Sequence, residues 1–441
     1  MRFAATLAIT VMLGVGLAPG ALARAGSARR ARVARTAATH GSRIARAPNS
    51  PAERTLVSAL NRGMSQAGSS SGAYVVDLTT GQALYSHNAN TGRLPASVEK
   101  LYTTTTALQR FGGGASLTTA VLGSGQLQGH TYVGTLYLRG GGDPTFGATS
   151  FDASNYGTGA TIQQLVFNLI ATTGITAFKG NIVADESVFD SDRGTPATNN
   201  QPSTEVEGEL SGLAFDRGWY NLQGTVLDTH PALDAGLELT STLRAAGVRL
   251  PANTRVGAGH TPATATQLAS VGSPPLATLI SLTNTPSDNF FAEMLLKDIG
   301  ARFGGGGTTP AGAAVVRAEM AARFGIHPRL NDGSGLSRYD LTTPVQVVTL
   351  LRAMAGSATF TSSLAVAGET GTLQYEMRGT SAQGRCRGKT GTLSDVSNVV
   401  GYCQAQDGHT LAYAVMMNHI DPNYAHPIQN RMLVAVAKYS G

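Results

Sequence analysis

The stretch Leu94-Pro95-Ala96-Ser97-Val98-Glu99-Lys100-Leu101-Tyr102 joins a loop to the start of a helix. Pro95 suits the entry to a helix, and the Leu, Tyr, Thr and Ala residues that follow can continue one. Ser97 and Lys100 are three residues apart, so one helical turn places both side chains on the same face. A lysine amine that is held neutral can take the proton of a serine hydroxyl. The stretch therefore predicts an activated serine, and the alternative is a helix N-cap serine beside a solvated lysine.

Lysine is rare in this chain, which makes Lys100 informative. Of the 33 basic residues only five are Lys, and the other 28 are Arg. Arginine does not lose its proton in proteins, so a site that needs an amine base needs lysine. Ser-x-x-Lys by itself is a common pattern, and the rest of the chain has to support the prediction.

Two later stretches carry side chains that suit the same chemistry. Ser287-Asp288-Asn289 precedes an apolar helix, where a serine and an amide can relay a proton and hold a substrate carbonyl. The alternative is an ordinary helix N-cap. Lys389-Thr390-Gly391-Thr392 lies in a strand-like run, where the glycine allows a substrate backbone to approach and the lysine offers a positive charge. The alternative is an exposed lysine on an edge strand.

In this order, the three stretches resemble the signature of penicillin-binding proteins and class A β-lactamases. From about residue 52 to its end, the chain is similar to the class C penicillin-binding proteins, the D-alanyl-D-alanine carboxypeptidase/endopeptidases of peptidase family S13. The similarity includes residues 74–77, 140–144, 332–337 and 388–392. Ser97 and Ser287 are 190 residues apart. That interval fits this family, which has extra domains there, better than a class A β-lactamase, which has a shorter interval and an additional deacylating glutamate.

The resemblance implies catalytic roles for four residues. Ser97 would be the acylating nucleophile and Lys100 its base. Ser287 and Asn289 would act in proton transfer to the leaving D-alanine and in substrate positioning.

The resemblance also implies a set of substrate-binding residues. Lys389 and Thr390, in the Lys-Thr-Gly stretch with Gly391, would bind the terminal carboxylate of the substrate or of a β-lactam. The backbone N–H groups of Ser97 and Thr392 would form an oxyanion hole. Shorter matches suggest that the third residue of the stem peptide contacts Asp143, Arg338 and Leu393.

The implied protein is an exported serine DD-peptidase that cleaves the D-Ala-D-Ala terminus of peptidoglycan stem peptides, with cross-linked stems as a second candidate substrate. β-Lactams would be covalent inhibitors. Two alternatives stay open: a serine β-lactamase or esterase on the same scaffold, and a non-catalytic wall-binding protein with this fold. No cofactor is expected, because the nine histidines show no metal-binding spacing and two cysteines cannot build a structural zinc site by themselves.

Strand patterns at both ends of the chain, with helical patterns between them, predict an α+β fold. Residues 52–124 and 267–441 would form a penicillin-binding, β-lactamase-like transpeptidase domain with an antiparallel sheet and helices. Helices are expected at 53–66, 276–280, 289–299, 311–324, 344–354 and 428–439, and strands at 73–78, 83–85, 385–393, 396–404 and 411–417. Residues 125–266 would form an inserted, mostly β region.

The N-terminus reads as an export signal followed by a basic arm. Residues 1–25 have the charged start, apolar run and small-residue cleavage site of a signal peptide, which predicts a periplasmic, cell-wall or extracellular protein. An uncleaved membrane anchor is the alternative, although the apolar run is short and interrupted. Residues 26–51 form an Ala/Arg-rich, disordered arm that could contact anionic wall polymer or a membrane surface, or be a plain spacer. Nothing in it indicates nucleic-acid binding.

The basic charge is confined to the N-terminus, and the body of the chain is nearly neutral. Residues 1–50 hold eight Arg and no acid, which leaves 25 basic and 27 acidic residues downstream. The only two cysteines, Cys386 and Cys403, would face each other across a hairpin centred on residues 394–395. In an exported protein such a pair predicts a disulfide, with two free thiols as the alternative.

Overall fold

The structure is a computed structural model that describes residues 50–221 and 223–441. The predicted signal peptide and residues 26–49 of the predicted arm lie outside the described residues. The last residue of that arm begins α1 (Pro51–Ala67), and Ser50 caps this helix by accepting a hydrogen bond from the Glu53 N–H. None of the described helices has the length and apolarity that a membrane span needs.

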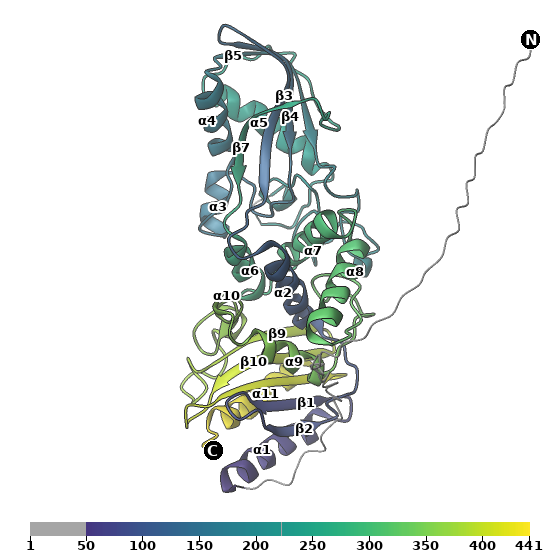
Figure 1. The fold of residues 1–441 in the computed structure, drawn as a ribbon, viewed down its shortest axis with the longest axis vertical. Helices are drawn as coiled ribbons and strands as arrows, with labels where there is room; N and C mark the ends of the chain where they lie inside the picture. The colour runs from purple at the N-terminus through teal and green to yellow at the C-terminus, as the bar shows by residue number, and fades with distance from the viewer. Residues whose placement is uncertain (1–49, 222) are drawn as a thin grey trace, which may run out of the picture. The chain divides into compact units, whose positions relative to one another are not determined.

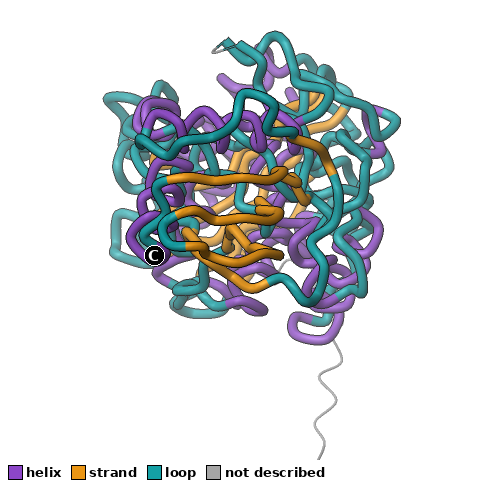
Figure 2. Tube along the Cα trace, turned by 90° about the horizontal axis from the view of Figure 1, so that it is seen from above, coloured by secondary structure: helices purple, strands orange, loops and turns teal. Residues whose placement is uncertain are grey.

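Strands from both ends of the chain form one antiparallel, six-stranded sheet, which confirms the predicted α+β fold (Figure 1). Its order is β2-β1-β11-β10-β9-β8. The strands are β1 (Gly72–Asp77), β2 (Ala83–His87), β8 (Ala365–Val366), β9 (Cys386–Leu393), β10 (Val396–Gln404) and β11 (Thr410–Asn418). Figure 2 shows strands of the structure side by side with helices around them.

Both faces of this sheet are covered by helices, and the alternation of residues along β11 shows how. Ala412, Ala414 and Met416 belong to the hydrophobic cluster that contains residues of α9 (Pro344–Met354). Tyr413 and Val415 belong to the cluster that contains residues of α1 and α11 (Pro422–Ala437). Because successive side chains of a strand point to opposite faces, the two helix layers lie on opposite sides of the sheet. This explains why the middle strands read as nearly continuous apolar runs.

The helices between the strands surround α7 (Asn289–Phe303), in which every residue from Phe290 to Gly300 is buried. The helices expected near residues 276, 289, 311 and 344 are all present. Around α7 lie α2 (Lys100–Phe111), α6 (Leu276–Asn284), α8 (Thr309–Glu319) with a π-helical turn at Met320–Phe324, and the short α10 (Ala358–Ser362). The 3-10 turn η1 (Ala96–Glu99) leads directly into α2.

The inserted region has its own five-stranded sheet and its own core. The sheet order is β6-β5-β4-β3-β7, from β3 (Thr118–Gln128), β4 (Thr131–Arg139), β5 (Ala177–Asp185), β6 (Val256–Ala258) and β7 (Thr266–Gly272). Strands β4 to β6 are parallel, and parallel neighbours need crossover connections, which here contain α3 (Thr149–Asn155), α4 (Ile162–Thr173) and α5 (Pro231–Ala245). Because β3 begins at Thr118 and β7 ends at Gly272, the sheet extends past the predicted limits of 125 and 266.

Cys386 and Cys403 are paired residues on β9 and β10, and they form a disulfide. Cys386 is the first residue of β9, three residues before Lys389, so the disulfide joins the beginning of β9 to β10. It therefore fastens the start of the Lys-Thr-Gly strand to the middle of the sheet.

Candidate functional site

Ser97 lies on a tight turn that the sheet holds in place. Ala96, just before it, has φ 46°, a left-handed conformation that few non-glycine residues adopt. From β10, the Asn398 side chain donates hydrogen bonds to the carbonyls of Leu94 (3.0 Å) and Pro95 (2.8 Å). Strained turns of this kind persist only where the surroundings fix them, and they concentrate at functional sites.

Lys100 contacts three oxygens from three separate parts of the chain. Its Nζ lies 2.9 Å from Ser97 Oγ, 2.6 Å from Asn289 Oδ1 and 2.9 Å from the carbonyl oxygen of Ser334. Complete burial lowers the pKa of Lys100 to about 8, against the opposing effect of nearby carboxylates, of which Glu207 is the strongest. Lys100 is therefore deprotonated far more easily near physiological pH than a solvent-exposed lysine.

The three contacts suit a neutral amine. Asn289 Oδ1 and the Ser334 carbonyl can only accept hydrogen bonds, so each takes one N–H of the amine. The third position faces Ser97 Oγ, and it holds the lone pair when the amine is neutral and a third N–H when it is protonated. In this arrangement a neutral Lys100 can accept the proton of the Ser97 hydroxyl.

The second predicted stretch forms the N-terminus of α7. Asp288 caps the helix by accepting from the Phe291 N–H (2.9 Å), and Ser287 before it is left-handed with φ 74°. Asn289 Nδ2 donates to the carbonyl of Glu205 (2.7 Å), and its N–H donates to Glu207 Oε2 (2.7 Å). Because the amide nitrogen is bound to Glu205, the amide oxygen faces Lys100.

The third predicted stretch lies on β9, packed directly against the turn that carries Ser97. A Cβ atom on Gly391 would lie 2.5 Å from the Pro95 carbonyl oxygen and 3.2 Å from the Ser97 backbone nitrogen, so only glycine fits. Lys389 is fully buried and donates to the carbonyl of Thr390 (2.9 Å). Burial lowers the pKa of Lys389 well below its usual value, and the charge of Lys100 lowers it further.

A cleft of about 760 Å³ opens beside Asn289 between the inserted region and β9. Arg338 and Leu393, both predicted contacts, line it. Arg338 donates to Ser394 Oγ (2.8 Å) and forms an ion pair with Asp395 (2.8 Å). The complete lining is Pro196, Ala197, Asn199, Thr204, Glu205, Glu207, Asn289, Leu336, Ser337, Arg338, Tyr339, Leu393 and Ser394.

The structure thus brings Ser97, Lys100, Asn289 and Gly391 together. Thr390 and Thr392 line a separate pocket beside Leu373 and Gln429, and Asp143 does not line the cleft. Its side chain is 2% exposed, and its Oδ1 accepts from the N–H and the hydroxyl of Thr145, both at 2.8 Å. Burial raises the pKa of Asp143 to about 7. The geometry gives this carboxyl a structural role in the loop after β4.

Sequence reasoning missed Ser334, Glu205, Glu207 and Asn398. Ser334 lies in the stretch 332–337 that carried the family resemblance, which is a signal that could have found it. Asn398 follows the predicted hairpin turn but has no distinguishing pattern. Glu205 and Glu207 lie in an irregular loop of the inserted region, where no sequence signal marks them.

Among the described residues, Glu99, Asp332 and Asp340 have the mutual spacing of metal ligands. Their oxygens lie within 4.8 Å of one another, and all three residues are buried. Burial raises the pKa of Glu99 and of Asp332 well above the usual values, and the neighbouring carboxylates raise both further. Protonation of one or more of these carboxyl groups would reduce the negative charge buried here.

Comparison with known proteins places this geometry in context. The model of the D-Ala-D-Ala carboxypeptidase 3 (S13) family matches residues 56–224 and 221–439. A D-alanyl-D-alanine carboxypeptidase of Actinomadura sp. (strain R39) is 32% identical over 459 residues, which covers 85% of this chain and 82% of the relative. Penicillin binding protein 4 of Haemophilus influenzae has a similar fold, with TM-score 0.72 and 19% identity over 86% of this chain and 99% of the other. Its complex with a β-lactam gives TM-score 0.68 at 19% identity, over 87% and 99%.

Proposed function

This chain belongs to the D-Ala-D-Ala carboxypeptidase 3 (S13) family, and from that premise we propose that it is a serine DD-peptidase that cleaves the D-Ala-D-Ala terminus of peptidoglycan stem peptides through an acyl-enzyme. The observation that carries the proposal is the contact of Lys100 Nζ with Ser97 Oγ, completed by the two acceptors Asn289 and Ser334. It is an amine base in place beside a hydroxyl nucleophile.

In the acylation step, neutral Lys100 takes the Ser97 proton as Oγ attacks the carbonyl carbon of the penultimate D-Ala. The C–N bond to the terminal D-Ala then breaks, and the leaving amine receives a proton relayed through Ser287. Lys389 and Thr390 would hold the terminal carboxylate, whose negative charge would favour the protonated form of the buried Lys389. Water releases the acyl group in the second step, with a proton again passing to the amine base.

The N–H groups of Ser97 and Thr392 form the oxyanion hole in this proposal. The approach of Gly391 to the Ser97 backbone nitrogen supports it, because Thr392 directly follows Gly391 on β9. Donors fixed before the reaction stabilise the developing charge without reorganisation.

The proposal predicts stoichiometric labelling by a fluorescent penicillin. The β-lactam ring presents a strained amide to the same nucleophile, so one dye per chain should be attached at Ser97 and located by peptide mass. The Ser97→Ala variant should remain unlabelled at an unchanged melting temperature. A folded wild-type protein that never becomes labelled would contradict the proposal.

A serine β-lactamase or esterase on the same scaffold is the second candidate, and Glu207 is the observation in its favour. Its carboxylate meets Asn289 at the edge of the cleft, and class A β-lactamases use an additional glutamate for deacylation. The rate of deacylation separates the two candidates. Slow release of the penicilloyl group supports the peptidase, and rapid turnover of penicillin supports the β-lactamase.

The proposed activity belongs outside the cytoplasm. Residues 1–25 would direct export and be removed, and residues 26–51 would tether the catalytic body near the wall or act as a spacer. Residues 52–124 and 267–441 would form the catalytic domain around the inserted region. Digestion of purified peptidoglycan, with fragments identified by mass, would reveal whether cross-linked stems are cleaved as well as D-Ala-D-Ala ends.

The contact between Glu207 and the site predicts a change in pH dependence. The negative charge of Glu207 raises the pKa of Lys100, against the larger opposing effect of burial. Glu207→Gln removes that charge, so the Lys100 pKa should fall and more of the amine should be neutral at low pH. The acidic limb of the acylation rate should therefore move to lower pH. Glu238→Gln, an exposed substitution on α5, is the control, and a limb that stays in place would contradict the assignment of Lys100 as the base.

A further inference from the structure

A buried ion pair connects the inserted region to the start of α7. Arg217 Nη1 and Nη2 donate to Asp288 Oδ2 (2.7 Å) and Oδ1 (2.9 Å). The Arg217 side chain is 6% exposed and that of Asp288 14%. Such a two-bond pair fixes orientation as well as distance. Asp288 lies between Ser287 and Asn289, so the pair holds the centre of the second motif.

Aromatic rings enclose the guanidinium of Arg217 on several sides. Its central carbon lies 5.2 Å from the ring centre of Trp219, 5.0 Å from that of Phe290 and 5.7 Å from that of Phe291. The rings keep water away from the pair, so its electrostatic attraction is weakly screened. The two phenylalanines belong to the first turn of α7. Their rings contact Arg217, and the backbone N–H of Phe291 donates to Asp288.

Arg217 also supports the loop that holds Asn289. Its Nε donates to the Glu207 carbonyl (2.9 Å), which also accepts from Trp219 Nε1 (3.0 Å). Glu207 has φ 67° and Arg217 has φ 62°, so both stand in conformations that require support from their surroundings. The same loop supplies the Glu205 carbonyl and the Glu207 carboxylate that bind Asn289. One arginine thus links both sets of contacts.

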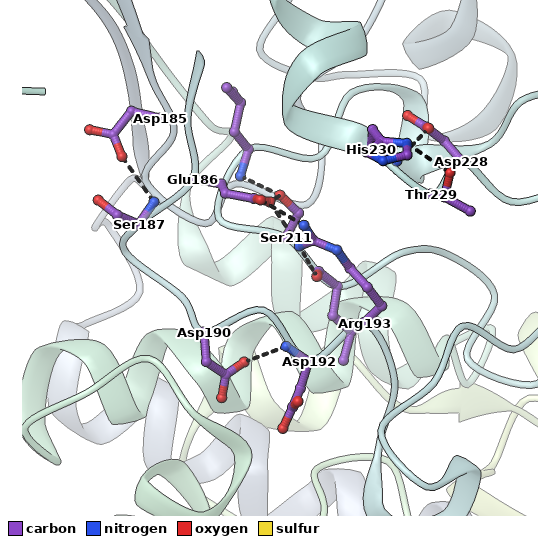
Figure 3. A network of polar contacts seen from close by, with 12 residues as sticks. Asp185, Glu186, Ser187, Asp190, Asp192, Arg193, Ser211, Asp228, Thr229 and His230 are labelled. Atoms are coloured by element: carbon purple, nitrogen blue, oxygen red, sulfur yellow. Dashed lines mark hydrogen bonds and ion pairs between the residues drawn. The ribbon is translucent and has the colours of Figure 1, made fainter. Parts of the chain in front are cut away.

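A second ion pair joins the inserted region to α7 farther along the helix. Lys297 Nζ lies 2.5 Å from Asp190 Oδ1 and donates to the Asp192 carbonyl at 2.7 Å, and the lysine is fully buried. Figure 3 shows Asp190 and Asp192 close together, with the Asp192 N–H donating to Asp190 Oδ1. Lys297 is eight residues after Asn289, which is about 12 Å along the helix. This pair fastens α7 without touching the second motif.

We infer that Arg217 is a positioning residue, through which the inserted region holds Ser287 and Asn289 in the orientation that catalysis needs. The inserted region is therefore part of the catalytic apparatus in addition to any role in recognising the substrate. Asn289 presents its oxygen to Lys100 because its nitrogen and backbone N–H are held by the loop that Arg217 supports. The inference rests on the proposed function for its catalytic consequence, and on the hydrogen bonds alone for its structural part.

The two ion pairs allow a matched test, because each can be broken by the same carboxylate-to-amide change. Asp288→Asn keeps a good helix cap but loses the charge that pairs with Arg217. Asp190→Asn removes the charge that pairs with Lys297. Arg217→Lys is the third variant, since lysine keeps the charge but not the two parallel bonds. Each variant is measured for its acylation rate constant with fluorescent penicillin, its half-saturating penicillin concentration, its melting temperature and its amide hydrogen exchange.

Asp288→Asn and Arg217→Lys should slow acylation by about 10- to 100-fold, because small displacements of catalytic groups cost this much. The half-saturating penicillin concentration should change far less. Amide exchange at residues 289 and 291 should accelerate in both variants. Asp190→Asn should retain wild-type acylation and wild-type exchange at these two amides, even where its melting temperature falls as much.

Two results would overturn the inference: wild-type acylation and wild-type exchange in Asp288→Asn, or an equal loss of acylation in Asp190→Asn. The second result would mean that general loosening of α7, and not Arg217, accounts for the effect. If the wild-type protein itself fails to acylate, the proposed function is wrong. The exchange at residues 289 and 291 then still decides whether Arg217 positions the motif.

Discussion

Lys100→Arg is expected to reduce acylation of Ser97 by roughly 10²- to 10⁴-fold, the contribution of a general base. Arginine keeps the positive charge and can still donate to Asn289 Oδ1 and the Ser334 carbonyl. It has no lone pair to offer, because a guanidinium does not deprotonate in proteins. The Ser97 proton then has no acceptor. The loss should appear in the rate of covalent labelling by penicillin at all accessible pH values.

Two further variants serve as controls for this prediction. Lys100→Met fills the same buried space without a charge, so it shows whether any loss comes from misfolding around a guanidinium. Lys438→Arg, an exposed change at the end of α11, should label like the wild-type protein. Near-normal acylation in a folded Lys100→Arg variant would show that another group takes the proton.

Gly391→Ala is expected to lower acylation by about 100-fold, because β9 must move away from the turn that carries Ser97. The new methyl group would lie 2.5 Å from the Pro95 carbonyl oxygen, a backbone atom that cannot rotate aside. The displacement would separate the Ser97 and Thr392 N–H groups and move Lys389 away from the position in which the proposed function needs it. Overpacking of this kind also costs about 1–3 kcal/mol in the free energy of unfolding.

The matched control is Gly257→Ala in β6 of the other sheet, where an added Cβ meets no atom within 4 Å. It should leave both acylation and the melting temperature nearly unchanged. Acylation by penicillin and chemical denaturation, measured on both variants, separate the two effects. A Gly391→Ala protein that acylates at the wild-type rate would show that β9 tolerates displacement at this point.

The elements that the sequence predicted best have local signals for their boundaries. The helix at 344–354 begins where expected because Thr343 caps it and Pro344 occupies its first turn. The strand at 396–404 is also matched, because apolar residues fill both of its faces. The inserted region was harder to predict. Its sheet pairs β3 with β7, far apart in the sequence, and its parallel strands depend on long crossover connections.

The candidate site also has residues that the sequence predicted and residues that it did not. Ser97, Lys100 and Asn289 are in motifs with fixed spacing, and the structure places them in contact. The residues that support them lie in the loop 205–217, where Glu207, Asp216 and Arg217 all have positive φ. None of these three positions is a glycine, the residue that usually indicates a positive φ. The sequence therefore contains no indication of the path by which this loop reaches α7. Asp143 shows the opposite case, a residue chosen by resemblance whose carboxyl is buried in its own loop.

The order of the six-stranded sheet also governs when the protein can fold. β1 pairs with β11, so the strand that begins at residue 72 cannot complete its hydrogen bonds until the strand that ends at residue 418 is present. Contacts between such distant parts of a chain close large loops, and they make folding slow. As the chain emerges N-terminus first, the β1–β2 hairpin has an unpaired edge until nearly all of the protein has appeared. The contacts that bring Ser97, Lys100 and Gly391 together can therefore form only late, after β9, β10 and β11 have joined β1 in the sheet.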